Sequence, residues 1–333
     1  MIPNQWYAVL SSKQLKSKPI GVIRMGEKMV FWRDDQGKVS CFPDQCVHRG
    51  VQLSRGKVAE GDRLRCPFHG LEYDVTGRVQ CIPSNGRTAP VPEHFKIKSY
   101  PTHEAHSFIW IWWGDSPPED LAPPRFFEDY DEDKLCSAEV IDPWDVHYSR
   151  VLENQLDTIH VPFVHTDSFG RGERYVCDGP GFQWLDEDMF IVQPTYHVED
   201  GTIAKKSEDL QMPLPKDQKL EFIFPNIWQN YITEKMRIIA AFVPVDDTHT
   251  LLYARVAQGF VQVPVLKKFM SLSMVPLVKH ILKQDRVIVN THRHKASQLR
   301  SGEKLVPGDK PVIEYRKRRA ALIEAAKPGS NET

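Results

Sequence analysis

Two short segments early in the chain combine cysteine with histidine. Cys46 and His48 form a Cys-x-His pattern, and Cys66 and His69 form a Cys-x-x-His pattern. Two thiolates and two imidazoles in this alternating order suit a [2Fe–2S] cluster in which Cys46 and Cys66 hold one iron while His48 and His69 hold the other. A zinc finger is the alternative, but its two cysteines normally precede its two histidines. The order of these residues therefore favours the iron–sulfur cluster.

A second group of possible metal ligands lies between Asn154 and His165. His160 and His165 would diverge on a continuous helix, because five positions correspond to roughly 140° around its axis. We expect Pro162 to end or kink that helix after His160, so that His165 can turn back towards it. Two converging imidazoles and one carboxylate make a facial triad, which binds Fe(II) and leaves positions open for dioxygen and substrate.

Two aspartates are candidates for roles at this second site. Asp157 lies one helical turn before His160 and is expected to accept a hydrogen bond from its imidazole rather than to bind iron. Asp285 is the choice for the third ligand, because its apolar helical surroundings make burial costly unless the carboxylate is paired or bound to metal. Periodicity alone does not decide this choice, and ordinary histidines near a proline remain the alternative for His160 and His165.

Composition is that of a soluble globular protein. The 333 residues are 41% hydrophobic and 26% charged, with a net charge of −1. This balance gives no electrostatic case for nucleic acid or an anionic membrane, and the basic run 316–319 is interpreted as the solvated face of a terminal helix. The four other cysteines show no disulfide framework. We find no signal peptide and no apolar run of about 20 residues, so the cytoplasm is the expected compartment.

The chain divides into an all-β part and an α+β part. Residues 1–115 are expected to form a small sandwich or partly open barrel, with strands at 21–31, 38–42, 63–66, 71–75 and 108–113. Prolines then interrupt regular structure up to residue 124. Residues 125–333 are expected to form an α+β domain. Its predicted helices are 148–158, 265–282 and 281–299, and its predicted strands are 182–197, 219–224, 236–244 and 250–258.

In combination, these motifs resemble the Rieske non-haem iron oxygenases, specifically their terminal oxygenase α subunits. The resemblance covers nearly the whole chain. It rests on Asn4-Gln5-Trp6-Tyr7, Cys-x-His-Arg-Gly, Cys-Pro-Phe-His-Gly, Asn-x-x-Asp-x-x-His-x4-His and Gln284-Asp285-Arg286-Val287. Length and single-chain organisation are similar to the branch that contains vanillate and dicamba O-demethylases and pheophorbide a oxygenase-like enzymes.

The resemblance implies a role for each ligand group. The first domain would be an all-β Rieske domain. The second would be a catalytic domain with an antiparallel sheet and helices in a helix-grip-like arrangement, in which His160, His165 and Asp285 bind a mononuclear Fe(II). Asp157 would link one of these histidines to a cluster histidine of the neighbouring subunit in a head-to-tail homotrimer. The chain has no Gly-x-Gly-x-x-Gly signature, so electrons from NAD(P)H would arrive through a separate reductase, with or without a ferredoxin between them.

The implied reaction is hydroxylation or oxidative demethylation of a small aromatic or alicyclic substrate with dioxygen. Two alternatives are a Rieske electron-transfer protein without its own oxygenase chemistry, and a binding or lipid-transfer module that has lost its iron site. Five residues are candidates for the substrate pocket, each with ordinary core packing as the alternative: Phe163, Trp228, Asn230, Met236 and Phe242.

Overall fold

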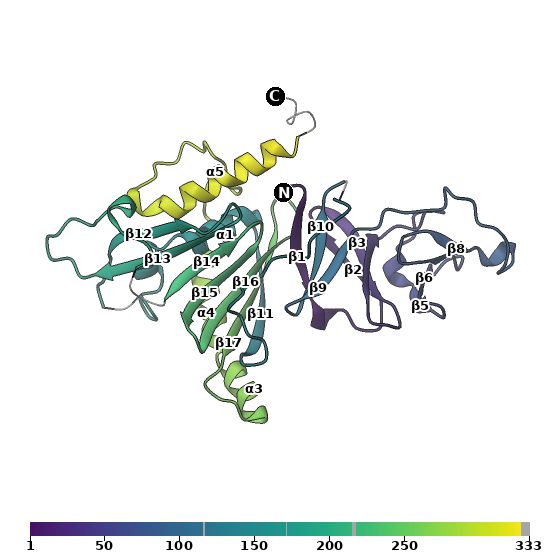
Figure 1. Cartoon of the computed structure of the whole chain (residues 1–333), viewed down its shortest axis with the longest axis horizontal. Coiled ribbons are helices and arrows are strands. Elements are labelled where there is room, and N and C mark those ends of the chain that lie inside the picture. Colours follow the sequence, from purple (N-terminus) through teal and green to yellow (C-terminus); the bar gives the residue numbers. More distant parts are fainter. Residues whose placement is uncertain (116, 171, 215–217, 328–333) are drawn as a thin grey trace. The chain divides into compact units, whose positions relative to one another are not determined.

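The computed structural model describes the chain except residues 116, 171, 215–217 and 328–333. Contacts between residues divide the chain into two compact units (Figure 1). One unit is Asn4–Pro124, and in the other Met1–Pro3 join Arg125–Thr333. The division therefore falls at the end of the proline-rich segment. No helix among the described residues is long and apolar enough to cross a membrane.

The first unit consists of short antiparallel strands in three sheets, which confirms the all-β prediction. The sheets have the orders β1-β10-β9, β2-β3-β4 and β5-β6-β7-β8. Their strands are β1 (Gln5–Ser11), β2 (Ile20–Arg24), β3 (Glu27–Arg33), β4 (Val39–Pro43), β5 (Lys57–Ala59), β6 (Arg63–Arg65), β7 (Glu72–Tyr73), β8 (Val79–Cys81), β9 (Thr102–Ala105) and β10 (Phe108–Trp113).

Two loops leave the core of this unit at buried cysteines. The loop that begins at Cys46 follows β4, and the loop that begins at Cys66 follows β6. Both cysteines belong to an apolar core that also contains Trp32, Phe42 and Tyr73. Close packing at the base of each loop therefore fixes it, while its later residues reach the surface.

The second unit is built on a seven-stranded antiparallel sheet of order β11-β17-β16-β15-β14-β13-β12. Strands β12 to β17 lie in sequence order, whereas β11 pairs with the last strand, β17, at the edge. The strands are β11 (Cys136–Trp144), β12 (Val176–Trp184), β13 (Met189–His197), β14 (Lys219–Ile223), β15 (Ile227–Thr233), β16 (Met236–Pro244) and β17 (Thr250–Gln258).

The helices of this unit lie on one face of the sheet, except α3, which projects from the end of the sheet (Figure 1). They are α1 (Tyr148–Leu156), α2 (Val161–Val164), α3 (Pro264–Ser273), α4 (Val275–Val289) and α5 (Lys310–Ala325). The strand register places Asp142, Trp228 and Phe222 on the same face. Arg286 of α4 donates a hydrogen bond to Asp142 there, at 2.6 Å, and Tyr315 of α5 packs edge-on against Phe222. This sheet and its helices confirm the predicted α+β class.

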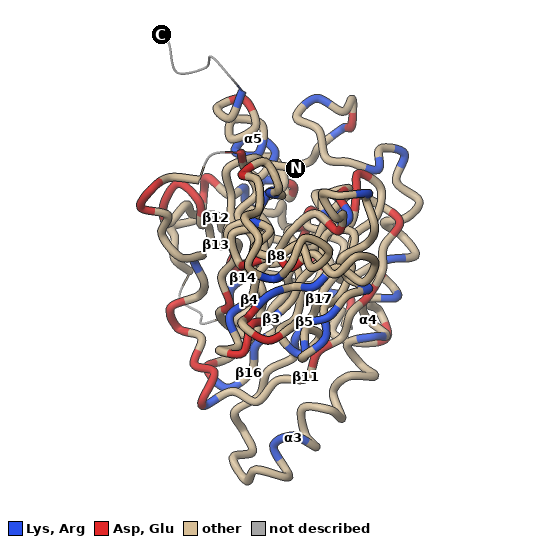
Figure 2. The backbone as a smooth tube through the Cα atoms, turned by 90° about the vertical axis from the view of Figure 1, so that its right-hand side faces the viewer, with Lys and Arg blue, Asp and Glu red and all other residues tan. Residues whose placement is uncertain are grey.

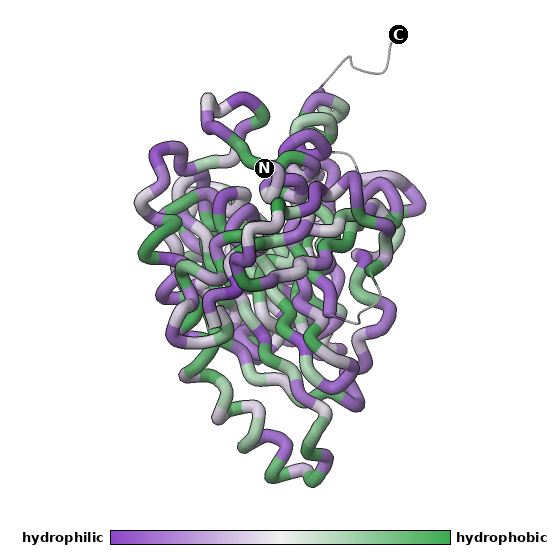
Figure 3. Tube along the Cα trace, turned by 90° about the vertical axis from the view of Figure 1, so that its left-hand side faces the viewer, coloured by the Kyte–Doolittle hydropathy of each residue, from purple (hydrophilic) through white to green (hydrophobic). Residues whose placement is uncertain are grey.

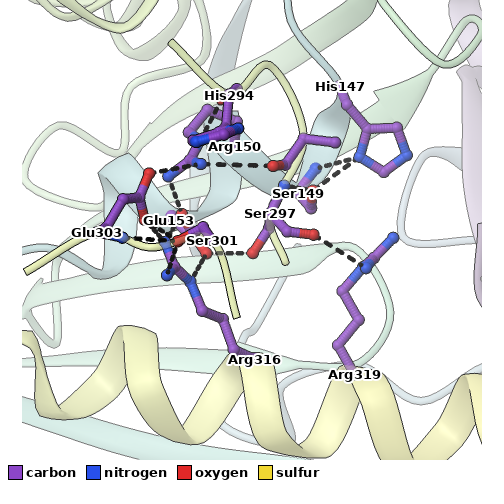
Figure 4. A network of polar contacts seen from close by, with 11 residues as sticks. His147, Ser149, Arg150, Glu153, His294, Ser297, Ser301, Glu303, Arg316 and Arg319 are labelled. Carbon is purple, nitrogen blue, oxygen red and sulfur yellow. Dashed lines mark hydrogen bonds and ion pairs between the residues drawn. The ribbon is translucent and has the colours of Figure 1, made fainter. Parts of the chain in front are cut away.

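A buried network of charged side chains joins α1 to α5 (Figure 4). Arg150 and Glu153 of α1 form an ion pair at 2.6 Å. Arg316 of α5 donates from Nε to Glu153 at 2.6 Å and from Nη2 to Glu303 at 2.6 Å. Arg150, Glu153 and Arg316 are each at most 5% exposed. Since buried charges persist only when they are paired, this network holds α1 against α5. The prediction that the basic run lies on a solvated face is therefore wrong for Arg316.

Several predicted elements have different bounds in the structure. The strand predicted at 21–31 is a hairpin of β2 and β3, which turns at Met25 and Gly26 with positive φ angles. The strand predicted at 182–197 is likewise two strands, the end of β12 and all of β13. Alternation of residue types is similar on both sides of a tight turn, so it merges the arms of a hairpin.

The helices near the metal-ligand residues also differ from prediction. The helix predicted at 148–158 ends at Leu156, because Asp157 has an extended conformation. The predicted helices 265–282 and 281–299 are replaced by α3 and by α4, which begins at Val275 with Pro276 in its first turn and ends at Val289. Proline is favoured at the start of a helix, where its missing N–H has no partner to lose.

Candidate metal centres

The two loops of the first unit share one backbone conformation. In each, the cysteine N–H donates to the carbonyl five residues later, and the cysteine carbonyl accepts from the glycine four residues later: Cys46 with Val51 and Gly50, and Cys66 with Leu71 and Gly70. Gly50 and Gly70 have φ angles of 73° and 75°. Only glycine adopts this left-handed region at little cost, so these glycines allow both loops to close.

In these two loops the cysteine side chains are buried and the histidine side chains are exposed. Cys46 and Cys66 are buried, with 4% and 2% of their surface exposed, whereas His48 and His69 are exposed and their rings are 4.8 Å apart. The Tyr73 hydroxyl lies 3.1 Å from Sγ of Cys46. Paired thiols inside and paired imidazoles outside fit a cluster in which each pair holds one iron.

Without a metal, the Cys66 thiol holds its proton more tightly than an ordinary cysteine, because its pKa is raised. Burial raises its pKa, and the neighbouring thiol of Cys46 acts in the same direction, while the backbone N–H groups of Phe68 and His69 lower it. Metal binding replaces the thiol proton, and the same N–H groups would then donate to the sulfur of the ligand. The donor set and its surroundings therefore fit the predicted iron–sulfur cluster.

A second centre forms where the two ends of α2 meet α4 in the second unit. His160 directly precedes α2, His165 directly follows it, and Asp285 lies on α4. Pro162 occupies the first turn of α2, so it begins a short helix rather than ending the helix that was predicted to contain His160. That single turn brings the two histidines to a ring separation of 5.4 Å. The expected convergence is thus achieved by a different local structure.

His160, His165 and Asp285 bring their ligand atoms within 4.8 Å of one another. Oδ1 of Asp285 is 3.0 Å from Nε2 of His165 and 3.4 Å from Nε2 of His160. Asp285 and His165 are buried, with 2% and 1% exposed. Yet Oδ1 of Asp285 accepts no aligned hydrogen bond. A buried carboxylate oxygen without a donor is costly, and a metal ion between these atoms would satisfy it.

The charges at this centre also favour a cation. Burial alone would lower the pKa of His160, but the Asp157 and Asp285 carboxylates outweigh it and raise that pKa to about 9. Burial alone would raise the pKa of Asp285, but the two imidazoles lower it to about 2. The carboxylates thus hold positive charge at the His160 imidazole, and a divalent metal can replace that proton.

Asp157 lies on the other side of the His160 ring. Its Oδ1 is 3.7 Å from Nδ1 of His160, which is longer than a hydrogen bond. The same oxygen accepts from the backbone N–H groups of Ile159 and His160, at 2.8 and 3.2 Å. Nδ1 of His160 is buried without a hydrogen-bond partner. Asp157 is therefore next to the imidazole, as predicted, but the predicted hydrogen bond is not formed.

Sequence reasoning missed the residues that orient His165. Nδ1 of His165 is 3.0 Å from Oε1 of Gln284. Nε2 of Gln284 donates to Asp167 at 2.9 Å, and Asp167 lies 2.8 Å from Nε2 of the exposed His280. A donor hydrogen on Nδ1 leaves Nε2 free to bind metal. Gln284 adjoins Asp285 in sequence, which was the only available signal.

The candidate pocket residues fall into two groups. The strand register places Trp228, Asn230, Met236 and Phe242 on the sheet face that carries Asp142, the partner of Arg286 on α4. Phe163 is 66% exposed on α2, so it does not line an enclosed core. The four sheet residues therefore stay candidates for the pocket.

Two family models match this chain. The Rieske [2Fe-2S] domain matches residues 5–101, and the vanillate O-demethylase oxygenase C-terminal domain matches residues 144–325, more than half of the chain. The chain belongs to the Rieske oxygenases with this C-terminal domain. In this family, the first unit described above is the Rieske domain, and the second contains the oxygenase domain.

Curated Rieske oxygenases share the family over part of their length. Chlorophyllide a oxygenase from Chlamydomonas reinhardtii is 37% identical over 170 residues, which are 51% of this chain and 25% of that protein. The vanillate O-demethylase oxygenase subunit of a Pseudomonas species is 34% identical over 170 residues, 51% of this chain and 47% of that protein. The chain thus matches about half or less of the length of these relatives.

Solved structures of Rieske oxygenases share the fold over nearly the whole chain. Dicamba monooxygenase bound to dicamba superposes with a TM-score of 0.73, covering 98% of this chain and 99% of that one at 20% sequence identity. The arrangement of both units' elements is therefore that of a known oxygenase structure.

Proposed function

We propose that this chain is a Rieske oxygenase component that uses dioxygen and electrons from a separate NAD(P)H reductase to oxidise a small aromatic or alicyclic substrate. The reaction would be hydroxylation or oxidative demethylation. The observation that carries the proposal is the convergence of His160, His165 and Asp285 around a buried carboxylate oxygen that lacks a hydrogen bond. An electron carrier has no use for such a site, and relatives that match this chain include a vanillate O-demethylase oxygenase subunit.

The chain's residues have separate tasks in this proposal. The bound cluster would supply electrons one at a time, and the bound Fe(II) would supply the chemistry of dioxygen. The buried Cys46 and Cys66 would hold one iron of the cluster, and the exposed His48 and His69 would hold the other, within reach of an electron donor. His160, His165 and Asp285 of the second unit would hold the mononuclear iron, and a set of two imidazoles and one carboxylate would leave positions for dioxygen and substrate.

Gln284 and the sheet complete the second centre. Gln284 accepts from Nδ1 of His165, which fixes the tautomer and the ring plane of that ligand. The buried aromatic side chains Trp228 and Phe242, as part of the pocket wall, would exclude water from the substrate. Exclusion of water protects reactive oxygen chemistry from side reactions, and an apolar wall suits an aromatic or alicyclic substrate.

We also propose a head-to-tail homotrimer in which Asp157 links the iron centre to the cluster of a neighbouring chain. Apolar side chains are exposed beside both centres. Phe68 is 56% exposed next to His69, and Phe163 and Phe169 are 66% and 58% exposed beside the second centre. Exposed apolar groups that surround functional polar ones are typical of protein interfaces, so the two centres have surfaces that could meet between chains.

A reducing compartment, the cytoplasm, is the proposed location. Among the described residues, none of the six cysteines forms a disulfide, and thiols persist where glutathione and thioredoxin keep them reduced. Cell fractionation with a cytoplasmic marker tests this location.

Iron content tests the central proposal. The purified chain should contain the two irons of the cluster, with matching acid-labile sulfide, and one further iron. Asp285→Ala should lose only the further iron, whereas the control Asp200→Ala, on an exposed turn, should keep all of it. A wild-type chain that binds no iron beyond its cluster would favour the electron-transfer alternative.

Oxygen consumption tests the reaction. With a surrogate reductase, uptake of dioxygen should depend on an aromatic substrate, and a methoxylated or N-methylated substrate should also release formaldehyde if the reaction is demethylation. A chain that binds substrate without any uptake of dioxygen would instead be a binding module.

A further inference from the structure

The helix α3 and the segment before it expose an extended apolar surface. Val265 is 79% exposed and Phe269 is 70% exposed, and Ser271 is the buried residue of this helix. Further exposed apolar side chains are Phe260, Val263, Leu266, Met270 and Leu272. Single exposed apolar residues are common on soluble proteins, but a contiguous group of this size indicates an interaction surface.

Hydrogen bonds between α3 and the sheet fix which side of this helix is exposed. The Ser271 hydroxyl donates to the carbonyl of Cys136 on β11 at 2.7 Å. Nε2 of Gln258, at the end of β17, donates to the carbonyl of Lys267 at 3.1 Å. Figure 1 shows α3 projecting from the end of the sheet in the second unit. The apolar side of α3 is therefore exposed because its polar side is bonded to the sheet.

The residues around α3 follow the pattern of an interfacial helix. At roughly 100° per residue, the exposed apolar side chains cover an arc of about 160°. In order around the helix they are Leu272, Val265, Phe269, Leu266 and Met270. Lys268 lies at one margin of this arc and Lys267 lies beyond the other. Such a helix can place its apolar arc among acyl chains while the lysines reach the headgroups.

The charge of the surrounding segment is of one sign. From Gly259 to Gln284 the sequence contains four lysines and no aspartate or glutamate. Figure 2 shows basic residues without acidic ones on the α3 tube, and Figure 3 shows apolar residues along this helix between hydrophilic ones. The net charge of −1 is that of the whole chain, so it does not reveal that this segment is positively charged. Lysines close to an apolar surface favour an anionic bilayer.

We propose that α3 docks this chain on an anionic lipid surface as a peripheral membrane protein. The charge of α3 disfavours its pairing with the same helix of a second copy. Lys267 and Lys268 of one chain would then face the same two lysines of the other, and the segment contains no acidic residue to pair with them. The proposal goes beyond the oxygenase function and does not depend on it, since lipid binding requires neither iron centre.

Binding to vesicles tests the docking surface. The full chain is mixed with vesicles of phosphatidylcholine, or of phosphatidylcholine with phosphatidylglycerol, and sedimented. It should bind the mixed vesicles, and added salt should weaken binding. Leu266→Ser with Phe269→Ser, and separately Lys267→Glu with Lys268→Glu, should each reduce the partition constant by about tenfold or more. The control is Ile203→Ser, because Ile203 is 95% exposed away from α3.

Three results would overturn the proposal. One is equal recovery with and without vesicles, and another is loss of binding in Ile203→Ser as large as in the α3 variants. The third is a smaller sedimentation coefficient of the Leu266/Phe269 variant in the absence of lipid, which would show that α3 is a contact between copies. Circular dichroism and the visible absorbance of the cluster confirm that each variant is folded, so a loss of binding reflects the surface itself.

Discussion

At the level of single residues, the imidazole of His160 lies between two carboxylates. Its Nε2 faces Asp285 at 3.4 Å, and its Nδ1 faces Asp157 at 3.7 Å. The two sides of the ring therefore have separate environments. Asp285 lies next to both His160 and His165, so all three can bind one metal ion. Asp157 lies on the opposite side of the His160 ring, so it can alter the charge and orientation of that imidazole without binding the metal itself.

Replacement of Asp157 by asparagine tests this division. The new side chain can still accept from the backbone N–H groups of Ile159 and His160, so the turn should keep its structure. It removes the negative charge beside Nδ1. We expect both iron sites to remain filled while turnover falls by about 100-fold, the upper range for such outer contacts. Iron analysis and steady-state rates measure the two effects, and near-normal turnover would contradict the proposed role in electron transfer.

Gln284 offers a test of the contact behind His165. Gln284→Leu keeps a similar volume but removes the acceptor of the Nδ1 hydrogen, so the imidazole can rotate or change tautomer. The dissociation constant for Co(II), which reports by its visible absorbance, should rise by about 10- to 100-fold. The control is His280→Gln, at the exposed far end of the same chain of contacts, where affinity should change little. Equal affinities of the two variants would mean that Gln284 does not position His165.

The sequence predicts the metal-ligand residues better than it predicts the residues that orient them. Cys46 with His48 and His160 with His165 are recognisable because short spacings and chemical types define them. The partner of Gln284 is 119 positions away in the chain, and the tyrosine beside Cys46 is 27 positions away. No local pattern shows such contacts, because polar side chains find them only after the fold brings them together. Local spacing also predicted that Pro162 ends a helix, whereas in the structure it lies in the first turn of α2.

At the level of elements, α1 is fixed by charges rather than by apolar packing alone. Glu153 accepts hydrogen bonds from Arg150 and from Arg316, which belongs to a helix 163 positions later. Asp157 directly follows α1, so the position of this helix also sets the position of Asp157. Arg316 was interpreted as part of a solvated basic run, because a run of like charges gives no indication of which member finds buried acids.

Arg316→Met tests the strength of this clamp. Loss of one guanidinium leaves Glu153 buried with only Arg150 as a charged partner, and such losses cost about 3 kcal/mol. Urea unfolding of the full chain should therefore show a destabilised transition for the second unit. Lys317→Met is the matched control, since Lys317 is exposed and its ion pair with Glu314 is worth about 1 kcal/mol or less. Equal effects of both substitutions would show that the network contributes no more than a surface pair.

Glu303 gives the same network a dependence on pH. Burial alone would raise the pKa of this carboxyl, but Arg316, Ser301 and Arg150 lower it to about 2. Because the folded pKa lies below the ordinary value near 4.5, the stabilisation is complete above that value and is lost as the pH falls towards 2. Glu303→Gln should therefore destabilise the chain at neutral pH. Its free energy of unfolding should also fall less than that of the wild type between about pH 5 and about pH 2. An unchanged slope in acid titrations would contradict this.

At the level of the whole molecule, the sequence predicts the two classes of structure but not the order of the large sheet. Strands β16 and β17 have the predicted bounds, because alternation and a clear turn define them. The pairing of β11 with β17 joins Cys136 to Gln258, a contact between strands that are distant in sequence. Strands β11 and β15 were not predicted at all. The family resemblance, rather than periodicity, supplied the expectation that two metal centres cooperate.

Mixed oligomers can decide whether cooperation occurs between chains. One chain carries Cys66→Ser, which removes a cluster ligand, and the other carries Asp285→Ala, which removes an iron ligand. Each alone should be inactive. In a head-to-tail ring, an intact cluster on one chain can serve an intact iron centre on the next. Each mixed trimer then has a single productive contact among its three, so the isolated mixed trimers should have about a third of wild-type turnover. Co-expression with two different affinity tags, followed by tandem purification, isolates the mixed oligomers, and sedimentation confirms that each variant still assembles. If electrons passed within one chain, every mixed oligomer would be inactive, because no chain would have both centres.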